Sequence, residues 1–376
     1  MIDENDTKKA LRAAHGAFFL SNKIINIGLI GPGIVGSVLL DQIKNELEKI
    51  KNDLNIDLQI RGVINSKKMI LSEMPIDLSN WREIWDKELN PANINKFVKQ
   101  LNDQSLPHTV LIDTTASEMV SKKYQEWSSK GIHIITPNKK ASTLPYQDFI
   151  KFKKALRQNK TQYFYETTVG AGLPIIETLQ GLIHTGDEIV SIEGVLSGTM
   201  GVICHRYDGS SSFSNLIKEL KETGYTEPDP RDDLSGMDVA RKVVILAREM
   251  GLKTNTSDVN ILGMIPKDLE GVPLENFMNE LSNYDQFYHD LFNTYKKPNE
   301  LLKYVGVINP KGKFEAKLQS YDKNHPFSRI AGSDNIVAFK TKRYFENPLI
   351  VQGPGAGPEV TAAGVFGDLL KLSRYQ

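Results

Sequence analysis

One short run between an apolar segment and a helical pattern constrains the fold of this chain more than any other feature. Residues 26–30 are apolar and favour a strand, and Gly31-Pro32-Gly33-Ile34-Val35-Gly36 separates them from a helical pattern over 34–51. In a G-x-G-x-x-G turn the first glycine makes the turn, the second admits a pyrophosphate and the third lets helix and strand pack. The helix N-terminus then faces the phosphates. The run predicts dinucleotide binding at Gly31, Gly33 and Gly36; the alternative is a glycine-rich turn of another α/β fold.

The segments that follow extend this pattern. Strands are predicted over 58–64, 110–112 and 132–136, with helices near 91–102 and 117–129 between them. Strands that alternate with helices are typical of a parallel sheet. The fold class predicted for this part is therefore α/β, with a Rossmann-type doubly wound parallel sheet.

The pattern changes after about residue 158. A helix is clearest over 237–250, and longer β segments are expected over 163–169, 188–196, 304–308, 314–319 and 336–341. This pattern of long β segments with helices among them predicts an α+β second domain on a mixed sheet. The expected division is a lead-in over 1–22, a nucleotide-binding domain over 23–158, a second domain over 159–345 and a segment over 346–376 that returns to the first domain.

The end of the second predicted strand bears on the choice of cofactor. Counting about 20 residues from the glycines reaches Asp57, but Asp57 opens that strand and so lies at its wrong end. The C-terminal end is Asn65-Ser66-Lys67-Lys68, where a carboxylate would bind the ribose hydroxyls of NAD. Polar and cationic side chains accommodate a 2′-phosphate instead, so NADP is favoured, with Ser66 in the site, and NAD stays possible. The alternative for the two lysines is a solvated loop.

Composition excludes several classes of partner. The 46 basic and 46 acidic residues give no net charge, so no basic field favours nucleic acid. The acidic N-terminus is unlike a signal peptide, and the glycine-containing apolar stretch over 24–40 is too short and interrupted to span a membrane. The single cysteine, Cys204, cannot form an internal disulfide and indicates a reducing compartment, for which we expect the cytoplasm.

A concentration of charge stands at 224–242. This segment holds five carboxylates around two prolines and then becomes helical. Asp238 and Lys242 are four residues apart, so on a helix they share one face and would present a carboxylate and an ammonium to the same ligand. The alternative is an ordinary surface ion pair, which contributes little.

Four further motifs stand along the chain besides the segment 224–242: Thr136-Pro137-Asn138-Lys139-Lys140-Ala141, Thr168-Val169-Gly170-Ala171-Gly172-Leu173-Pro174, Ser197-Gly198-Thr199, and Gly355-Ala356-Gly357 followed by Val360-Thr361-Ala362-Ala363-Gly364. Together and in this order they closely resemble homoserine dehydrogenase, over nearly the whole chain. The resemblance is greatest to the dehydrogenase half of bifunctional aspartokinase/homoserine dehydrogenase.

The resemblance implies NAD(P)-dependent interconversion of L-homoserine and L-aspartate 4-semialdehyde, on the route to threonine and methionine. It implies Lys242 as the proton donor or acceptor, with Lys139 between cofactor and substrate. It also implies a substrate site with Glu227, Asp238 and Gly224, and a cofactor site that adds Ile34, Val35, Thr115, Lys139 and Gly357 to the glycines. It further implies a sodium site at Glu166 and the backbone oxygens of Val169, Ala171 and Leu173, and a catalytic and dimerisation role for the second domain, hence a homodimer.

These residue types suit that chemistry without the family name. Hydride delivered to an aldehyde leaves a developing alkoxide, which needs a cation or a proton donor, and lysine supplies either. The turn 170–172 exposes carbonyl groups, and oxygen ligands suit a hard cation. The alternative for Glu166 is a buried cap on that turn.

Two other functions fit parts of the sequence. Aldehyde oxidation through a thiohemiacetal, as in aspartate-semialdehyde dehydrogenase, would need Cys204 as nucleophile. A non-enzymatic NADP-binding sensor would not need Lys139, Glu227, Asp238 and Lys242 together. The 376 residues of the sequence contain no segment that resembles an aspartokinase or a regulatory tail, so we expect activity to be insensitive to threonine. Whether the chain is free-standing or excised from a fusion stays open.

Overall fold

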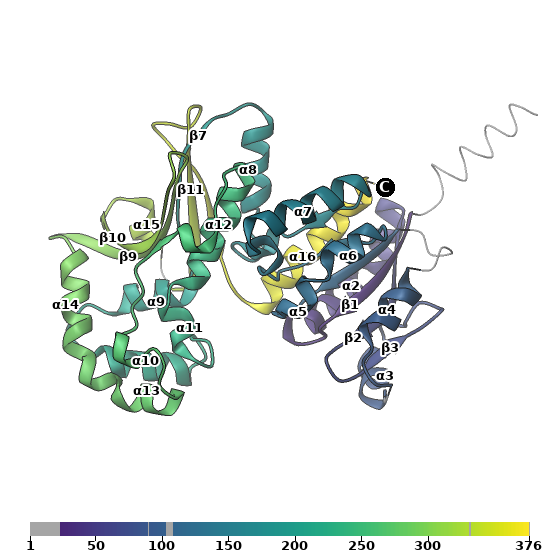
Figure 1. The fold of residues 1–376 in the computed structure, drawn as a ribbon, viewed down its shortest axis with the longest axis horizontal. Helices are drawn as coiled ribbons and strands as arrows, with labels where there is room; N and C mark the ends of the chain where they lie inside the picture. Colours follow the sequence, from purple (N-terminus) through teal and green to yellow (C-terminus); the bar gives the residue numbers. More distant parts are fainter. Residues whose placement is uncertain (1–22, 89, 103–107, 331, 376) are drawn as a thin grey trace, which may run out of the picture. The chain divides into compact units, whose positions relative to one another are not determined.

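The structure is a computed structural model in which residues 23–88, 90–102, 108–330 and 332–375 are described; the predicted lead-in over 1–22 lies outside them. The chain forms two compact units (Figure 1). The first contains the residues up to Asn138, Lys151–Tyr165, and the residues from Val365 on, and the second contains Lys139–Ile150 and Glu166–Gly364. The expectation of a contiguous boundary near residue 158 therefore differs from the structure, in which the chain passes between the units four times.

The first unit is built on a six-stranded sheet in the order β3-β2-β1-β4-β5-β6. Its strands are β1 (Lys23–Ile30), β2 (Ile56–Ile64), β3 (Met69–Leu71), β4 (Thr109–Asp113), β5 (His133–Ile135) and β6 (Tyr163–Phe164). All neighbouring pairs are parallel except β2 with β3. The predicted doubly wound parallel sheet is thus confirmed, with one antiparallel edge strand that the sequence analysis did not predict.

The helices that lie wholly in this unit are α2 (Ile34–Leu54), α3 (Trp81–Lys87), α4 (Ile94–Leu101), α5 (Glu118–Ser121) and α6 (Tyr124–Ser129), with a last 3₁₀ turn, η8 (Ser373–Tyr375). Two more, α7 (Tyr146–Gln158) and α16 (Pro358–Leu372), begin in the second unit and end in the first. The helix predicted over 117–129 is two short helices, because Lys123 N–H bonds to the Val120 carbonyl and tightens the turn between them. That turn buries Tyr124 and Trp127.

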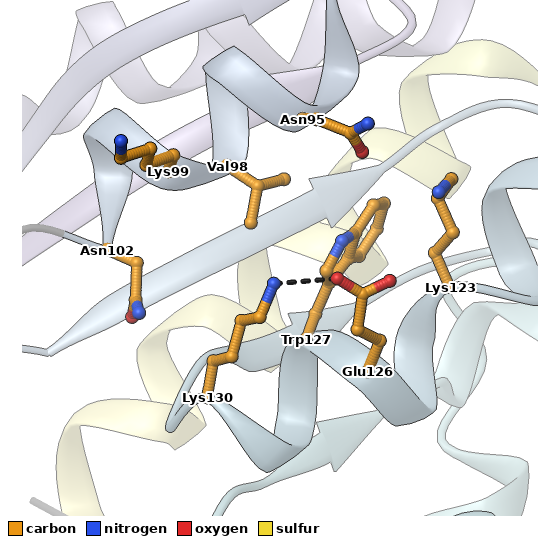
Figure 2. A pocket seen from close by; sticks show the side chains of 8 residues that line it. All are labelled: Asn95, Val98, Lys99, Asn102, Lys123, Glu126, Trp127 and Lys130. Atoms are coloured by element: carbon orange, nitrogen blue, oxygen red, sulfur yellow. Dashed lines mark hydrogen bonds and ion pairs between the residues drawn. The ribbon is translucent and has the colours of Figure 1, made fainter.

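An open groove of about 800 Å³ lies between α4 and α6 in the first unit (Figure 2). Three lysines line it, Lys99, Lys123 and Lys130, and the last is paired with Glu126 at 2.6 Å. None of the described residues that line it is among the predicted site residues. The groove therefore plays no part in the site described below.

The strand predicted over 163–169 is wrong in its length. Only Tyr163 and Phe164 are extended, and they pair with β5 at the edge of the first sheet. The chain then turns through the 3₁₀ helix η4 (Glu166–Thr168) and through left-handed Gly170 and Ala171, with φ of 78° and 52°. The strand ends here because the following residues form a buried turn instead of a ladder.

The second unit contains a mixed sheet in the order β12-β11-β7-β9-β10-β8. Its strands are β7 (Ile189–Val195), β8 (Asn260–Ile261), β9 (Glu300–Asn309), β10 (Lys313–Asp322), β11 (Asp334–Thr341) and β12 (Leu349–Pro354). The pairs are antiparallel except β8 with β10. The predicted mixed sheet is confirmed, and β12, which pairs with β11, keeps residues 349–354 in this unit.

In the second unit α12 (Met237–Glu249) contacts β9 and β10, and the helices α8 (Ile175–His184) and α11 (Pro230–Leu234) pack against it. The others are α9 (Gly198–Arg206), α10 (Phe213–Glu222), α13 (Leu274–Glu280), α14 (Asp285–Tyr295) and α15 (Pro326–Arg329), and a 3₁₀ turn, η3 (Ala141–Thr143), also contacts α12. Among the described residues, no helix is long and apolar enough to cross a membrane.

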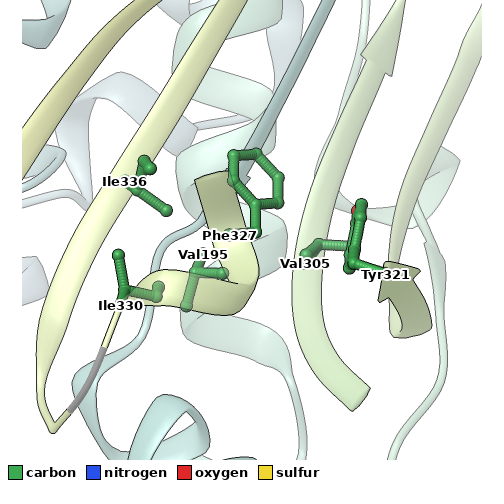
Figure 3. Packing of buried hydrophobic residues seen from close by; sticks show 6 residues of the cluster. All are labelled: Val195, Val305, Tyr321, Phe327, Ile330 and Ile336. Atoms are coloured by element: carbon green, nitrogen blue, oxygen red, sulfur yellow. The ribbon is translucent and has the colours of Figure 1, made fainter. Parts of the chain in front are cut away.

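A hydrophobic cluster stabilises the other face of this sheet (Figure 3). Gly306 of β9 faces α12, since a Cβ there would lie 2.8 Å from the Val243 side chain. Side chains alternate along a strand, so Val305 points to the opposite face. There it belongs to a buried cluster with Val195, Tyr321, Phe327, Ile330 and Ile336. Both faces of the sheet are therefore packed, and α12 is held on a rigid support.

Candidate active site

The glycine turn between β1 and α2 has a different steric reason for each glycine. Gly31 has a φ of 92°, and a Cβ on it would lie 2.5 Å from the Thr115 Cγ2 atom. A Cβ on Gly36 would lie 2.3 Å from the Gly31 carbonyl oxygen, whereas a Cβ on Gly33 would meet nothing within 4 Å. The first and third glycines are thus required by packing, and the second leaves an open approach to the backbone.

Residues at the C-terminal end of β4 form hydrogen bonds that hold this glycine turn in place. The Thr114 hydroxyl donates to the Gly31 carbonyl at 2.6 Å, and the Thr115 N–H donates to Asp113 Oδ1 at 2.8 Å. Asp113 is fully buried, and its Oδ2 accepts from the Tyr124 hydroxyl and from the Asn138 amide. Burial raises the pKa of Asp113, against these hydrogen bonds, which lower it. The sequence analysis did not identify this carboxylate, which orients Thr115.

The surface above the turn is apolar and exposed. Ile34, the first residue of α2, is 77% exposed, and Val35 is half-buried. The N-cap residue of α2 is Gly33, which supplies no side-chain hydrogen bond to the first turn. The N–H groups of that turn and two aliphatic side chains therefore lie where the sequence predicts a dinucleotide.

The basic turn after β2 has one exposed lysine and one engaged lysine. Asn65 Oδ1 accepts from the N–H groups of Lys67 and Lys68, each at 2.8 Å, which reverses the chain into β3. The Lys68 ammonium donates to the Trp85 carbonyl and lies 4.8 Å from the centre of its ring. Ser66 and Lys67 are exposed. Of the polar residues predicted to accommodate a 2′-phosphate, these two remain directed to solvent.

Two lysines meet one carboxylate in the second unit. Lys242 Nζ lies 2.7 Å from Asp238 Oδ2, one helical turn away on α12, and Lys139 Nζ lies 3.3 Å from Asp238 Oδ1. The predicted common face of Asp238 and Lys242 is confirmed. The Lys242 side chain is only 9% exposed, compared with 29% for Lys139 and 37% for Asp238. The pair is therefore largely buried at one end and open at the other, unlike an ordinary surface ion pair.

The electrostatics of this cluster favour proton transfer by Lys242. Burial lowers the pKa of the Lys242 ammonium, and the charge of Lys139 adds to this, against the attraction of Asp238. For Asp238, burial raises the pKa, but the two lysines outweigh it and hold the pKa well below its usual range. Asp238 therefore stays ionised, while Lys242 becomes a stronger acid than a solvated lysine.

A backbone carbonyl completes the surroundings of Lys242. The Leu196 oxygen accepts from Lys242 Nζ at 2.6 Å and from the Asn335 amide at 3.4 Å. Asn335 is fully buried, and its Oδ1 has no partner among the described residues. The lysine is thus held between one carboxylate and one carbonyl, which fixes its direction.

The loop and the short helix α11 before α12 supply further carboxylates. Asp233 Oδ2 accepts from the Glu227 N–H at 2.8 Å, and the Glu227 side chain is exposed. Burial raises the pKa of Asp233 to about 6, and the nearby charges of Glu227 and Asp238 add to the rise. Gly224, with a φ of 74°, is exposed at the start of the same loop. Asp233 was not predicted, although it lies within the acidic segment that the sequence analysis singled out.

Glu166 acts as a cap in this structure. Its Oε1 accepts from the Ile176 N–H at 2.6 Å and its Oε2 from the Glu177 N–H at 2.9 Å, at the N-terminus of α8. Glu166 is thus a buried cap, as in the alternative, but it caps the N-terminus of α8 and not the turn 170–172. The Leu173 carbonyl, one of the predicted sodium ligands, accepts from the Ile175 N–H at 2.9 Å.

The remaining predicted cofactor residue and the lone cysteine lie elsewhere in the second unit. Gly357, with a φ of 121°, ends the loop between β12 and α16. Cys204 is buried in α9, and burial raises the pKa of its thiol to about 12. A thiol with that pKa is not a nucleophile near neutral pH, which argues against the thiohemiacetal route.

Comparison with known protein families matches both parts of the chain. The model described as "Homoserine dehydrogenase, NAD binding domain" matches residues 31–166. The model described as "Homoserine dehydrogenase" matches residues 174–370. The first match covers the glycine turn, and the second covers the cluster of Asp238 and Lys242.

Individual relatives agree with these matches. A chloroplastic bifunctional aspartokinase/homoserine dehydrogenase 2 of Arabidopsis thaliana is 48% identical over 100% of this chain and 41% of its own length. The homoserine dehydrogenase of Schizosaccharomyces pombe is 39% identical over 93% of this chain and 95% of its own. A hyperthermophilic archaeal homoserine dehydrogenase solved with NADPH has a TM-score of 0.73 at 22% identity, over 94% of this chain and 98% of its own, and supports the fold. The chain thus spans less than half of the bifunctional protein and nearly all of the yeast enzyme, and it belongs to the homoserine dehydrogenase family.

Proposed function

We propose that this chain interconverts L-homoserine and L-aspartate 4-semialdehyde with a nicotinamide cofactor. The observation that carries the proposal is the buried Lys242 ammonium, held 2.7 Å from Asp238 beside a second lysine on the same carboxylate. An aldehyde that accepts hydride needs a proton or a positive charge at its oxygen, and this cluster offers both. The reaction would serve threonine and methionine synthesis, as the resemblance implies.

The residues around the glycine turn fit a dinucleotide. The position of Gly33 is open, the first turn of α2 has no side-chain cap, and Ile34 and Val35 offer apolar surface. When bound, the reduced nicotinamide would supply the hydride. Thr115, Lys139 and Gly357 are proposed to complete the cofactor site. NADP is favoured over NAD by exposed Ser66 and Lys67, and the archaeal relative was solved with NADPH.

In the chemical step, Lys242 is proposed to give a proton to the aldehyde oxygen during reduction and to take it back during oxidation. Asp238 holds that lysine and, with Glu227 and Gly224, is proposed to bind the amino-acid end of the substrate. Asp233 adds a carboxylate to the same loop. Lys139 is proposed to stabilise the developing negative charge. The lowered pKa of Lys242 assists donation, since less work is needed to remove its proton.

Glu166 and the carbonyls of Val169, Ala171 and Leu173 are proposed as a sodium site. The donor set consists of oxygen atoms alone, as a hard cation prefers. A cation there would order the turn with left-handed Gly170 and Ala171 and the start of α8. Its proposed role is structural, because Glu166 already organises that turn.

The assembly and location are also proposals. A homodimer through the second unit is proposed from the resemblance. A cytoplasmic location is proposed from the single buried cysteine, which suits a reducing compartment. Gel filtration with light scattering would test the first, since a monomer at assay concentration would contradict it.

One assay tests the activity. We expect NADPH oxidation that depends on aspartate semialdehyde, and a slower rate with NADH at equal concentration. Lys242→Ala serves as the matched inactive control, because it removes the ammonium from the cluster. Nicotinamide binding without turnover in the unmodified chain would favour the sensor function over the enzyme.

A further inference from the structure

A buried arginine stands at the far end of the helix that carries Asp238 and Lys242. Arg248 of α12 is 6% exposed, and it donates to backbone carbonyls and to the Asn255 Oδ1 atom. Burial lowers its pKa to about 10, so the guanidinium stays charged at neutral pH. The proposed chemistry does not use this residue, and a buried charge needs a reason.

The acceptors of Arg248 lie on the segment that follows Lys139. Nη1 donates to the Ser142 carbonyl at 2.8 Å, and Nη2 donates to the Leu144 carbonyl at 2.8 Å. On the other side, Nε and Nη2 donate to the Thr254 carbonyl at 3.0 and 2.9 Å. The planar fork of the guanidinium therefore joins two separate stretches of chain to α12.

Thr143, which lies between Ser142 and Leu144 in the chain, binds the backbone of Lys139. The Lys139 carbonyl accepts from the Thr143 hydroxyl at 2.9 Å and from the Thr143 N–H at 3.1 Å. A continuous set of contacts thus leads from Arg248 through 142–144 to the backbone of Lys139. The Lys139 side chain in turn binds Asp238, which lies on the same helix as Arg248.

Aromatic and amide groups fix the next turn of the same segment. The guanidinium lies 4.8 Å from the centre of the Phe149 ring and 5.6 Å from that of Tyr146. The Tyr146 N–H donates to Asn255 Oδ1 at 2.8 Å, and that oxygen lies 3.4 Å from Arg248 Nη2. Residues 139–150 leave the first unit and return to it, and these contacts explain why they belong to the second.

We propose that Arg248 is a positioning residue that sets the Lys139 ammonium against Asp238 by binding the backbone of residues 142–144. The proposal rests on the proposed function, because it assigns Lys139 a role in the reaction. A helix is stiff over the two or three turns from Asp238 to Arg248, so anchoring the segment at one end fixes the lysine at the other. A purely structural role for Arg248 is the competing explanation.

A double-mutant cycle separates the two explanations. Arg248→Met keeps an apolar chain against the aromatic rings but leaves the carbonyls of Ser142, Leu144 and Thr254 without their donor. Acting through Lys139, it should lower kcat by about 10- to 100-fold, the cost of a small misplacement. In the Lys139→Ala background the same change should lower kcat by about twofold or less, because the lysine it positions is gone. Equal losses in both backgrounds would overturn the proposal.

Two companion variants guard against a general loss of folding. Arg248→Lys returns a charged donor and should recover part of kcat. Tyr288→Phe removes another buried hydrogen bond to a carbonyl, that of Met264, and should lower stability without changing kcat. If Tyr288→Phe lowers kcat as much as Arg248→Met at matched stability, the effect is general and the proposal fails.

Hydrogen exchange provides a measurement that does not depend on turnover. In Arg248→Met, peptides covering 139–150 should exchange faster, while peptides of β9 and β10 should not change. Unchanged exchange over 139–150 would contradict the proposal that Arg248 holds this segment. A wild-type chain without dehydrogenase activity would refute the proposed function instead, and the exchange experiment would still test whether Arg248 holds residues 142–144.

Discussion

The glycine turn of the first unit and the lysine–aspartate cluster of the second are built in different ways. The turn is a contiguous run of six residues whose geometry follows from backbone sterics, such as the 2.3 Å from a Cβ on Gly36 to the Gly31 oxygen. The cluster joins Lys139 to Asp238 and Lys242, about 100 residues later in the chain, and it depends on charge and burial. A site made of backbone is readable from local sequence, whereas a site made of tertiary contacts is not.

The largest effect is expected in the cluster. Lys242→Ala should lower kcat by about 10² to 10⁴, the range for a positioned acid or base. Asp238→Ala should raise KM, because Asp238 is proposed to bind substrate, and should also lower kcat, because both lysines lose the carboxylate that holds them. The pH profile of homoserine oxidation decides which lysine transfers the proton. Should Lys242→Ala retain kcat while Lys139→Ala abolishes it, the proton transfer belongs to Lys139.

A pair of alanine substitutions sharpens the contrast within the glycine turn. Gly36→Ala should destabilise the chain by about 1–3 kcal/mol, because its Cβ would overlap a carbonyl oxygen. Gly33→Ala should leave stability nearly unchanged but weaken NADPH binding, since its Cβ fills only the open approach. Urea unfolding and fluorescence titration of NADPH measure the two effects. Equal loss of stability in both variants would contradict the separate roles.

Asp233 provides a pH test on the second unit. Its pKa is raised from 3.8 to about 6, so the folded chain binds a proton between those values that the unfolded chain has lost. Stability from this group is therefore present below pH 4 and lost as the pH rises through 6. After discounting for partial exposure, the loss is about 1–2 kcal/mol. The Asp233→Asn variant should not show this pH-dependent loss of stability. If its free energy of unfolding changes between pH 4 and pH 7 as much as that of the wild type, the assignment is wrong.

The smallest effect concerns cofactor choice. Ser66→Asp should shift the ratio of kcat/KM for NADPH over NADH by about tenfold towards NADH, or 1.4 kcal/mol. A carboxylate there repels a 2′-phosphate and binds free ribose hydroxyls. Lys68→Ala is a suitable comparison, because its ammonium is bonded to Trp85 and should influence the ratio less. A wild type that prefers NADH tenfold would refute the interpretation of this turn.

Sequence reasoning succeeded where a period or a steric rule acts locally. The four-residue spacing of Asp238 and Lys242 gave their common face, and alternating strands and helices gave the first sheet. The role of Lys139 came only from the resemblance, because no local rule links it to α12. The prediction of a strand over 163–169 was wrong, because the spacing of these residues does not reveal that Glu166 caps α8.

Two residues escaped prediction for different reasons. Arg248 binds mainly backbone carbonyls, and every residue carries such groups, so no complementary side chain in the sequence points to it. Asp113 binds the side chains of Tyr124 and Asn138, but no local spacing rule links it to residues 11 and 25 positions away. Asp233, in contrast, stood within a visible acidic segment, and only its burial was hidden.

The bond from Lys23 Nζ to the Ser373 carbonyl, at 3.0 Å, has a consequence for the order of folding. It joins residues 350 positions apart in the chain, and both belong to the first unit. During synthesis this bond can form only after residue 373 has left the ribosome, later than Glu166–Gly364. Closing so long a loop is slow, so we expect the Lys23–Ser373 contact to form late, after β1 has already paired with β2 and β4.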